Sequence, residues 1–149
     1  MLMTVDEFMV YPSPDGVKTE LVRGELRMSP PPGGSHGCAG SNLLARLMAH
    51  VIPQRLGRVF GDGVGYELLQ LPRTVRVPDA SYVHADRPPA SGVGPGLLRF
   101  APDVAIEVLS PSETKTGVQE KIDDYVSGGT TLIWVVDVDE IFDGIARDL

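Results

Sequence analysis

The stretch Ala101-Pro102-Asp103-Val104-Ala105-Ile106-Glu107-Val108-Leu109-Ser110 is an apolar run that a single carboxylate, Glu107, interrupts. A short apolar run such as residues 104–109 is typical of a central strand buried on both faces. Side chains alternate along a strand, so Glu107 shares a face with Asp103 and Ala105. A carboxylate inside such a strand is costly without a partner. We therefore expect a cation beside Glu107, either a metal ion or a salt bridge from Lys121.

A second carboxylate, Asp79, occurs in a similar setting. It follows a proline in Val75-Arg76-Val77-Pro78-Asp79-Ala80-Ser81-Tyr82-Val83, next to a predicted strand. Mg²⁺ sites use one or two carboxylates together with water and phosphate oxygens. We therefore predict that Asp79 and Glu107 converge on one side of the sheet and form a metal site for phosphodiester chemistry. The plainer alternative makes Asp79 a turn residue beside a strand.

The rest of the chain predicts two long helices and several short strands. A capping-box spacing and two helical periodicities favour helices over 4–10, 35–55 and from 112 or 114 to 127. Strands are expected over 19–22, 25–28, 58–60, 65–69, 74–77 with a continuation over 79–83, 104–109 and, buried, 131–136. This order implies an α/β or α+β domain with a mixed sheet flanked by helices.

Composition limits the function classes. The chain has 149 residues, one domain of ordinary size, and a net charge of -7, which argues against a broad basic surface for non-specific nucleic-acid binding. The single cysteine, Cys38, rules out an intrachain disulfide and fits a reducing compartment. No apolar run is long enough to span a membrane and no signal peptide is visible, so we expect a cytoplasmic protein without a membrane partner.

Three further residues are candidates for the same chemistry. Lys121 lies at the flank of the apolar face of the last predicted helix, from which its ammonium group could orient an attacking water; the alternative is a solvated helix surface. Glu20 opens a predicted strand and is a third possible metal ligand, or else a partner of Arg23. His36 follows a glycine-rich loop at a helix start, where it could contact a substrate phosphate or be purely structural.

These segments resemble the Uma2 family of the PD-(D/E)XK nuclease superfamily. The resemblance covers roughly residues 4–137 and is carried by the segments Glu20-Leu21-Val22-Arg23-Gly24-Glu25, Val77-Pro78-Asp79, Pro102 to Ser112 and Glu120-Lys121-Ile122-Asp123-Asp124-Tyr125. It implies a restriction-endonuclease-like core and a hydrolase that cuts DNA with Mg²⁺ or Mn²⁺.

The resemblance also implies a role for each site residue. Asp79 would be the aspartate of the PD element and Glu107 the acidic residue of the (D/E)XK element. Position 109 is Leu109 where the lysine of that element is expected, and Lys121 would replace it from the next helix. Glu20 would be the third metal ligand. A role for His36 at the edge of the site is also implied.

The chain departs from the family pattern near its end. Family members continue past the strand over 131–136, whereas this chain reads Val138-Asp139-Glu140-Ile141 and stops at Leu149. We therefore expect one Uma2-like domain over 1–149 that is shortened at the C-terminus. An edge left uncovered in this way predicts a homodimer, with Leu97, Leu98 and Phe100 as contact residues. The alternative to a nuclease is a degenerate, non-catalytic binding or assembly module, which need not bind Mn²⁺.

Overall fold

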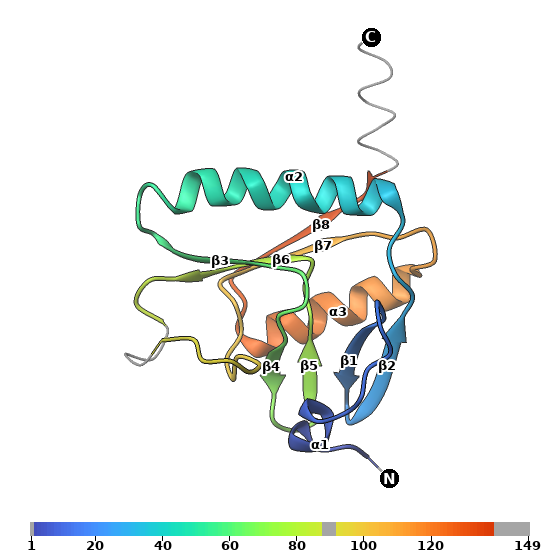
Figure 1. The fold of residues 1–149 in the computed structure, drawn as a ribbon. Helices are drawn as coiled ribbons and strands as arrows, with labels where there is room; N and C mark the ends of the chain where they lie inside the picture. The colour runs from blue at the N-terminus through green and yellow to red at the C-terminus, as the bar shows by residue number, and fades with distance from the viewer. Residues whose placement is uncertain (1, 88–91, 139–149) are drawn as a thin grey trace.

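The computed structural model describes residues 2–87 and 92–138 (Figure 1). The helices are α1 (Val5–Met9), α2 (Gly34–Val51) and α3 (Lys115–Gly128), and the strands are β1 (Lys18–Val22), β2 (Glu25–Ser29), β3 (Gly57–Gly61), β4 (Tyr66–Leu69), β5 (Thr74–Arg76), β6 (Ala80–His84), β7 (Val104–Val108) and β8 (Leu132–Val136). The predicted shortening of the C-terminus falls on residues 139–149, which lie outside the described residues. The mixed α/β class predicted from the sequence is confirmed.

The strands form two four-stranded sheets where the sequence predicted one. The first sheet has the order β2-β1-β5-β4 and the second the order β3-β6-β7-β8. The first is antiparallel throughout, whereas β7 and β8 pair in parallel and make the second sheet mixed. The expected continuation of the strand over 74–77 into 79–83 is wrong. Val77-Pro78-Asp79 instead carries the chain from the first sheet to the second, since proline has no N–H for a ladder.

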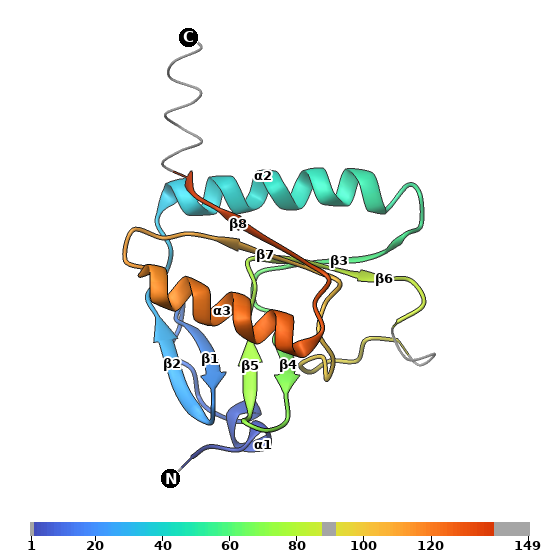
Figure 2. The same ribbon diagram turned by 180° about the vertical axis from the view of Figure 1, so that it is seen from behind.

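The helices separate and cover the sheets. In Figure 1, α2 lies along one face of the second sheet, while α3 lies on its other side. Seen from behind in Figure 2, α3 also covers the first sheet. Tyr125 of α3 is fully buried and belongs to one core cluster with Tyr66, Val83 and Ala105, drawn from both sheets and from α3. Contacts with both sheets therefore fix the position of α3.

The ends of α3 follow from its sequence. The Thr114 side chain accepts a hydrogen bond from the Gly117 N–H and caps the first turn. At the other end Gly129 adopts a left-handed conformation with φ 96°, which a residue with a side chain rarely adopts. The helix is thereby held to fourteen residues, and its start lies next to the end of β7.

Strand β7 is central, as predicted, and Ala105 to Val108 are buried. The prediction that the strand over 131–136 is buried is wrong: β8 is an edge strand, and Leu132, Trp134 and Val135 are exposed. Of the proposed contact residues, Leu98 is assigned wrongly, because it is buried in the core where its loop folds over β4. Leu97 and Phe100 are half-buried and pack against core clusters, so a dimer contact through them stays a prediction.

No helix within residues 2–87 and 92–138 is both long enough and apolar enough to cross a membrane.

Candidate active site

Asp79 lies at the crossing between the two sheets and is fixed against β7. Its N–H donates to the Ile106 carbonyl oxygen at 2.9 Å, and its Oδ2 accepts from the Val108 N–H at 2.7 Å. The side chain is almost fully buried, with 5% of its surface exposed. Ile106 and Val108 are the two neighbours of Glu107 in β7. These two bonds therefore hold Asp79 beside Glu107, near the end of β7.

Glu107 is buried and has partners on both oxygens. Tyr125 donates its hydroxyl proton to Oε1 at 2.7 Å, and the Lys121 ammonium contacts Oε2 at 3.2 Å. The pKa of Glu107 is raised to about 7: burial raises it most, the charges of Glu20 and Asp79 add to this, and the positive charge of Lys121 opposes it. The site therefore concentrates negative charge that only nearby cations make tolerable.

Lys121 projects from α3 toward Glu107, as the sequence predicts. Its ammonium also contacts Glu113 Oε1 at 2.6 Å. Burial alone would lower the pKa of Lys121, but the neighbouring carboxylates, Glu107 first, outweigh burial and raise it. The lysine is therefore a fixed positive charge at the site, and the alternative of a freely solvated lysine does not describe its position.

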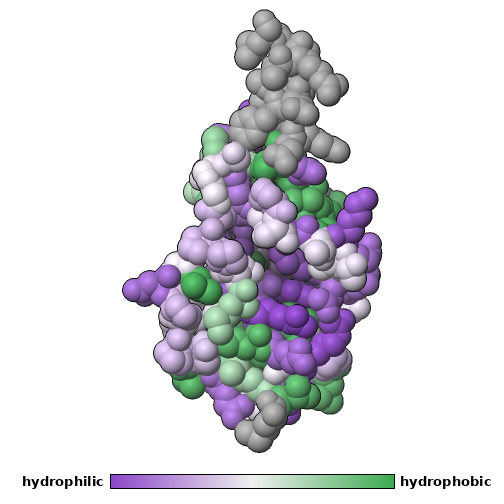
Figure 3. Space-filling model, turned by 90° about the vertical axis from the view of Figure 1, so that its right-hand side faces the viewer, coloured by the Kyte–Doolittle hydropathy of each residue, from purple (hydrophilic) through white to green (hydrophobic). Residues whose placement is uncertain are grey.

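Asp79, Glu107 and Lys121 line one cavity of about 480 Å³. The end of β2 with the loop that follows it to Gly33, and the loop from Ser110 to Glu113, also line it. These loops lie on the side of the molecule that Figure 3 faces, where hydrophilic side chains gather around the centre of the surface. The predicted convergence of the two carboxylates therefore takes the form of a shared, solvent-accessible cavity.

His36, from the first turn of α2, also lines the cavity. Its Nε2 lies 3.3 Å from Asp79 Oδ2, and 13% of its side chain is exposed. A substrate that enters the cavity would meet this imidazole, so the position fits the predicted role at the edge of the site.

Sequence reasoning missed three residues of the site. Lys18 contacts Asp79 Oδ1 at 2.5 Å, Glu113 holds Lys121, and Tyr125 holds Glu107. Lys18 precedes Glu20 by two positions and therefore shares its face of β1, a signal that strand alternation could have given. Glu113 and Tyr125 gave no comparable signal, because their roles depend on how α3 is placed.

Glu20 lies apart from the cavity wall, in a buried cluster of charges. Its Oε2 accepts from Arg76 at 2.9 Å and its Oε1 from the Val77 N–H at 2.8 Å. Its partner is thus Arg76, whereas the sequence suggested Arg23. Arg76 also binds Asp124 of α3, with its Nε at 2.9 Å and Nη2 at 2.7 Å from the same oxygen. The role of Glu20 as a metal ligand stays a prediction.

The donors in the cavity fit a hard divalent cation. Asp79 and Glu107 supply carboxylate oxygens, and Mg²⁺ needs only one or two of these when water and phosphate complete its shell. Among the described residues, no group of three or more His, Cys, Asp and Glu side chains is arranged to hold a metal ion. A site built from these residues would therefore depend on water and substrate oxygens for its other ligands.

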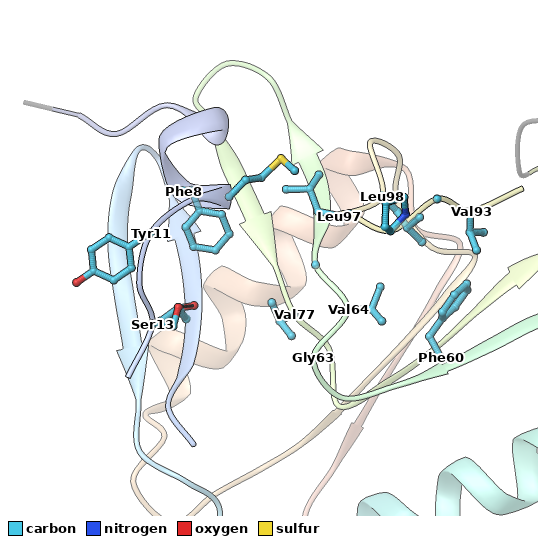
Figure 4. A pocket seen from close by; sticks show the side chains of 16 residues that line it. Phe8, Tyr11, Ser13, Phe60, Gly63, Val64, Val77, Val93, Leu97 and Leu98 are labelled. Carbon is cyan, nitrogen blue, oxygen red and sulfur yellow. Dashed lines mark hydrogen bonds between the residues drawn. The ribbon is translucent and has the colours of Figure 1, made fainter. Parts of the chain in front are cut away.

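A second cavity, of about 540 Å³, lies on the other side of β1 and is shown in Figure 4. Its walls include Phe8, Tyr11, Phe60 and Leu97, and none of the residues that line it is charged. A cavity without an acid, a base or a cation offers no group for hydrolysis. The charged cavity around Asp79 and Glu107 is therefore the candidate active site, although it is the smaller of the two.

Comparisons with known proteins bear on the kind of protein this chain is. A family model described as "Uma2: Putative restriction endonuclease" matches residues 5–141. A crystal structure of "a putative nuclease belonging to DUF820" from Anabaena variabilis is similar with a TM-score of 0.80 and 29% sequence identity. The match covers 93% of this chain and 75% of that chain. No curated protein matches the chain.

Proposed function

Because the chain belongs to the Uma2 family, we propose that it is a metal-dependent endonuclease that hydrolyses phosphodiester bonds of DNA. The observation that carries the proposal is the cavity in which Asp79 from the sheet crossing, Glu107 from β7 and Lys121 from α3 meet. Two carboxylates that line one cavity, with a lysine beside them, suit the binding of a divalent ion and a phosphate.

Each residue has a distinct part in this proposal. Asp79 and Glu107 would hold Mg²⁺ or Mn²⁺, which supplies a polarised phosphate oxygen and a bound water of lowered pKa. Tyr125, by its hydrogen bond to Oε1, fixes how the Glu107 carboxylate is turned. Glu113 fixes the Lys121 ammonium beside Glu107, where it can orient the attacking water and stabilise charge that develops on the phosphate. His36 would contact the substrate at the rim.

The test is a cleavage assay on plasmid DNA with Mg²⁺ or Mn²⁺, repeated with a chelator. We expect cleavage by the parent protein and by the Glu25→Ala control, which changes an exposed carboxylate on β2, 63% exposed. Glu107→Ala should lose both cleavage and Mn²⁺ binding. Cleavage by the Glu107→Ala protein at the parent rate would refute the proposed site.

A non-catalytic binding or assembly module is the second candidate. Lysines already neutralise both Asp79 and Glu107 in the folded chain, and the net charge of -7 does not favour DNA as a general ligand. Mn²⁺ titration followed by calorimetry separates the candidates. Absence of binding, together with absence of cleavage, would favour the second.

A further inference from the structure

Lys18 has a position that the roles above do not explain. Its ammonium lies between two carboxylates, 2.5 Å from Asp79 Oδ1 and 3.0 Å from Asp62 Oδ1. The side chain is largely buried, with 19% exposed, and lines the cavity together with Lys121 and His36. The ammonium group of Lys18 is therefore a second cation held at the site.

The two carboxylates that hold Lys18 differ in setting. Asp79 is buried, whereas Asp62 is 50% exposed and belongs to the turn after β3. Asp62 Oδ1 also accepts from the Gly63 N–H at 2.9 Å, and Gly63 has a φ of 96°. This turn holds the Asp62 carboxylate in place independently of Asp79. Lys18 thus has one anchor in the cavity wall, Asp79, and one, Asp62, that does not line the cavity.

A divalent ion on Asp79 would compete with Lys18 for the same oxygen. The other oxygen, Oδ2, accepts from the Val108 N–H at 2.7 Å and lies 3.3 Å from His36 Nε2, whereas Lys18 is the partner of Oδ1. Mg²⁺ binds an oxygen at about 2.0–2.1 Å, which excludes an ammonium group from that side of the oxygen. The displaced ammonium would keep its contact with Asp62 and remain in the wall of the cavity. Lysine binds phosphate as a point charge.

We propose that Lys18 is a substrate-binding residue. Its ammonium group contacts the Asp79 carboxylate until a divalent ion binds there. The ammonium group then keeps its contact with Asp62 and contacts a non-bridging oxygen of the DNA phosphate. This inference rests on the proposed function. It predicts opposite effects of one substitution on two ligands, since Lys18 opposes the metal and favours the phosphate. A purely structural lysine would weaken both.

The variant Lys18→Met removes the charge and keeps the length of the side chain. Its matched control is Lys115→Met, at an exposed position at the start of α3. Without DNA, we expect the affinity for Mn²⁺, measured by calorimetry, to rise several-fold in Lys18→Met and to stay unchanged in the control. With a short DNA duplex and Ca²⁺, measured by fluorescence anisotropy, affinity should fall about tenfold and the salt slope by about 1. Lys18→Arg should restore DNA affinity.

Asp62→Asn tests the second anchor without altering the cavity wall. We expect it to weaken DNA binding in the same direction as Lys18→Met, with Mn²⁺ affinity unchanged within about twofold. Unchanged or weaker Mn²⁺ binding by Lys18→Met overturns the inference, as does unchanged DNA binding or a parent protein that binds neither ligand. A parent protein that binds both ligands but does not cleave DNA refutes only the proposed function, because the two binding measurements still decide the role of Lys18.

Discussion

The buried charges around Arg76 allow a quantitative prediction. The guanidinium group, 4% exposed, donates three hydrogen bonds, one to Glu20 and two to Asp124. Arg76→Met would remove the buried cation between Glu20 and Asp124, while Asp124 would keep its 3.5 Å contact with the half-exposed Arg23. Breaking a buried ion pair in this way costs about 3–5 kcal/mol, and we expect about 4 kcal/mol. Typical domains have only about 5–15 kcal/mol of stability, so the loss would be large.

Urea unfolding followed by circular dichroism measures this loss. With an m-value of about 2 kcal/mol per molar, the midpoint should fall by about 2 M. The matched control is Arg23→Met, because Arg23 pairs with the same α3 carboxylate, Asp124, but is half exposed. Exposed pairs contribute about 0–1 kcal/mol, so the control should shift the midpoint by less than about 0.5 M.

A triple variant separates the effect of charge from the effect of packing. Arg76→Met combined with Glu20→Gln and Asp124→Asn removes the cation and both carboxylates together. Replacing a whole buried ion cluster is often close to neutral, so most of the lost stability should return. A triple variant no more stable than Arg76→Met would show that the loss comes from packing, and the electrostatic argument would then fail.

Four further measurements follow from the site and the fold. Lys121→Ala should keep Mn²⁺ binding and lower cleavage by about two to three orders of magnitude; cleavage at the parent rate would refute its role. Glu20→Gln should lower stability, because Glu20 pairs with Arg76, and should leave the affinity for Mn²⁺ unchanged if Glu20 does not bind the metal. Loss of Mn²⁺ binding in this variant would show that Glu20 is a metal ligand. Burial alone would raise the pKa of Glu113, but hydrogen bonds from Lys121 and the Ser110 N–H lower it below 4.5. The stability from Glu113 is then present above that value and is lost as pH falls through the folded pKa, so from about pH 5 downward the parent should lose more unfolding free energy than Glu113→Gln. The homodimer prediction is kept on the exposed apolar side chains of the edge strand β8; light scattering at micromolar concentration should give a dimer mass, and a monomer mass rejects it.

Most secondary structure could be predicted from the sequence because it depends on local signals. The predicted capping box is present at α1, formed by Thr4 and Glu7, and α3 ends at Gly128, one residue beyond the predicted end. The apolar run around Glu107 correctly indicated a central strand. Which strands share a sheet could not be predicted in the same way. The crossing at Val77-Pro78-Asp79 looks in sequence like the continuation of a strand, and only long-range pairing separates its two sides.

The candidate site was predictable to the extent that an unusual residue marked it. Asp79 and Glu107 were conspicuous because each interrupts or borders an apolar strand. Of their partners, Lys121 was predicted, whereas Lys18 and Tyr125 were not, since a lysine at the start of a strand or a tyrosine in a helix is ordinary in sequence. Glu20 shows the same limit: its place at the start of a strand marked it as a candidate, but its partner Arg76 lies 56 positions away in the chain.

The two lysines beside the carboxylates also bear on how the protein is produced. Small zinc domains acquire much of their folding free energy from the metal, so they are unfolded without it. Here Lys18 and Lys121 already balance the charges of Asp79 and Glu107 within the chain. Synthesis and folding can therefore be completed before any ion arrives, and purification in a chelator should leave the native state intact. The supply of divalent ions would then determine when a molecule becomes competent, while the amount of folded protein stays the same.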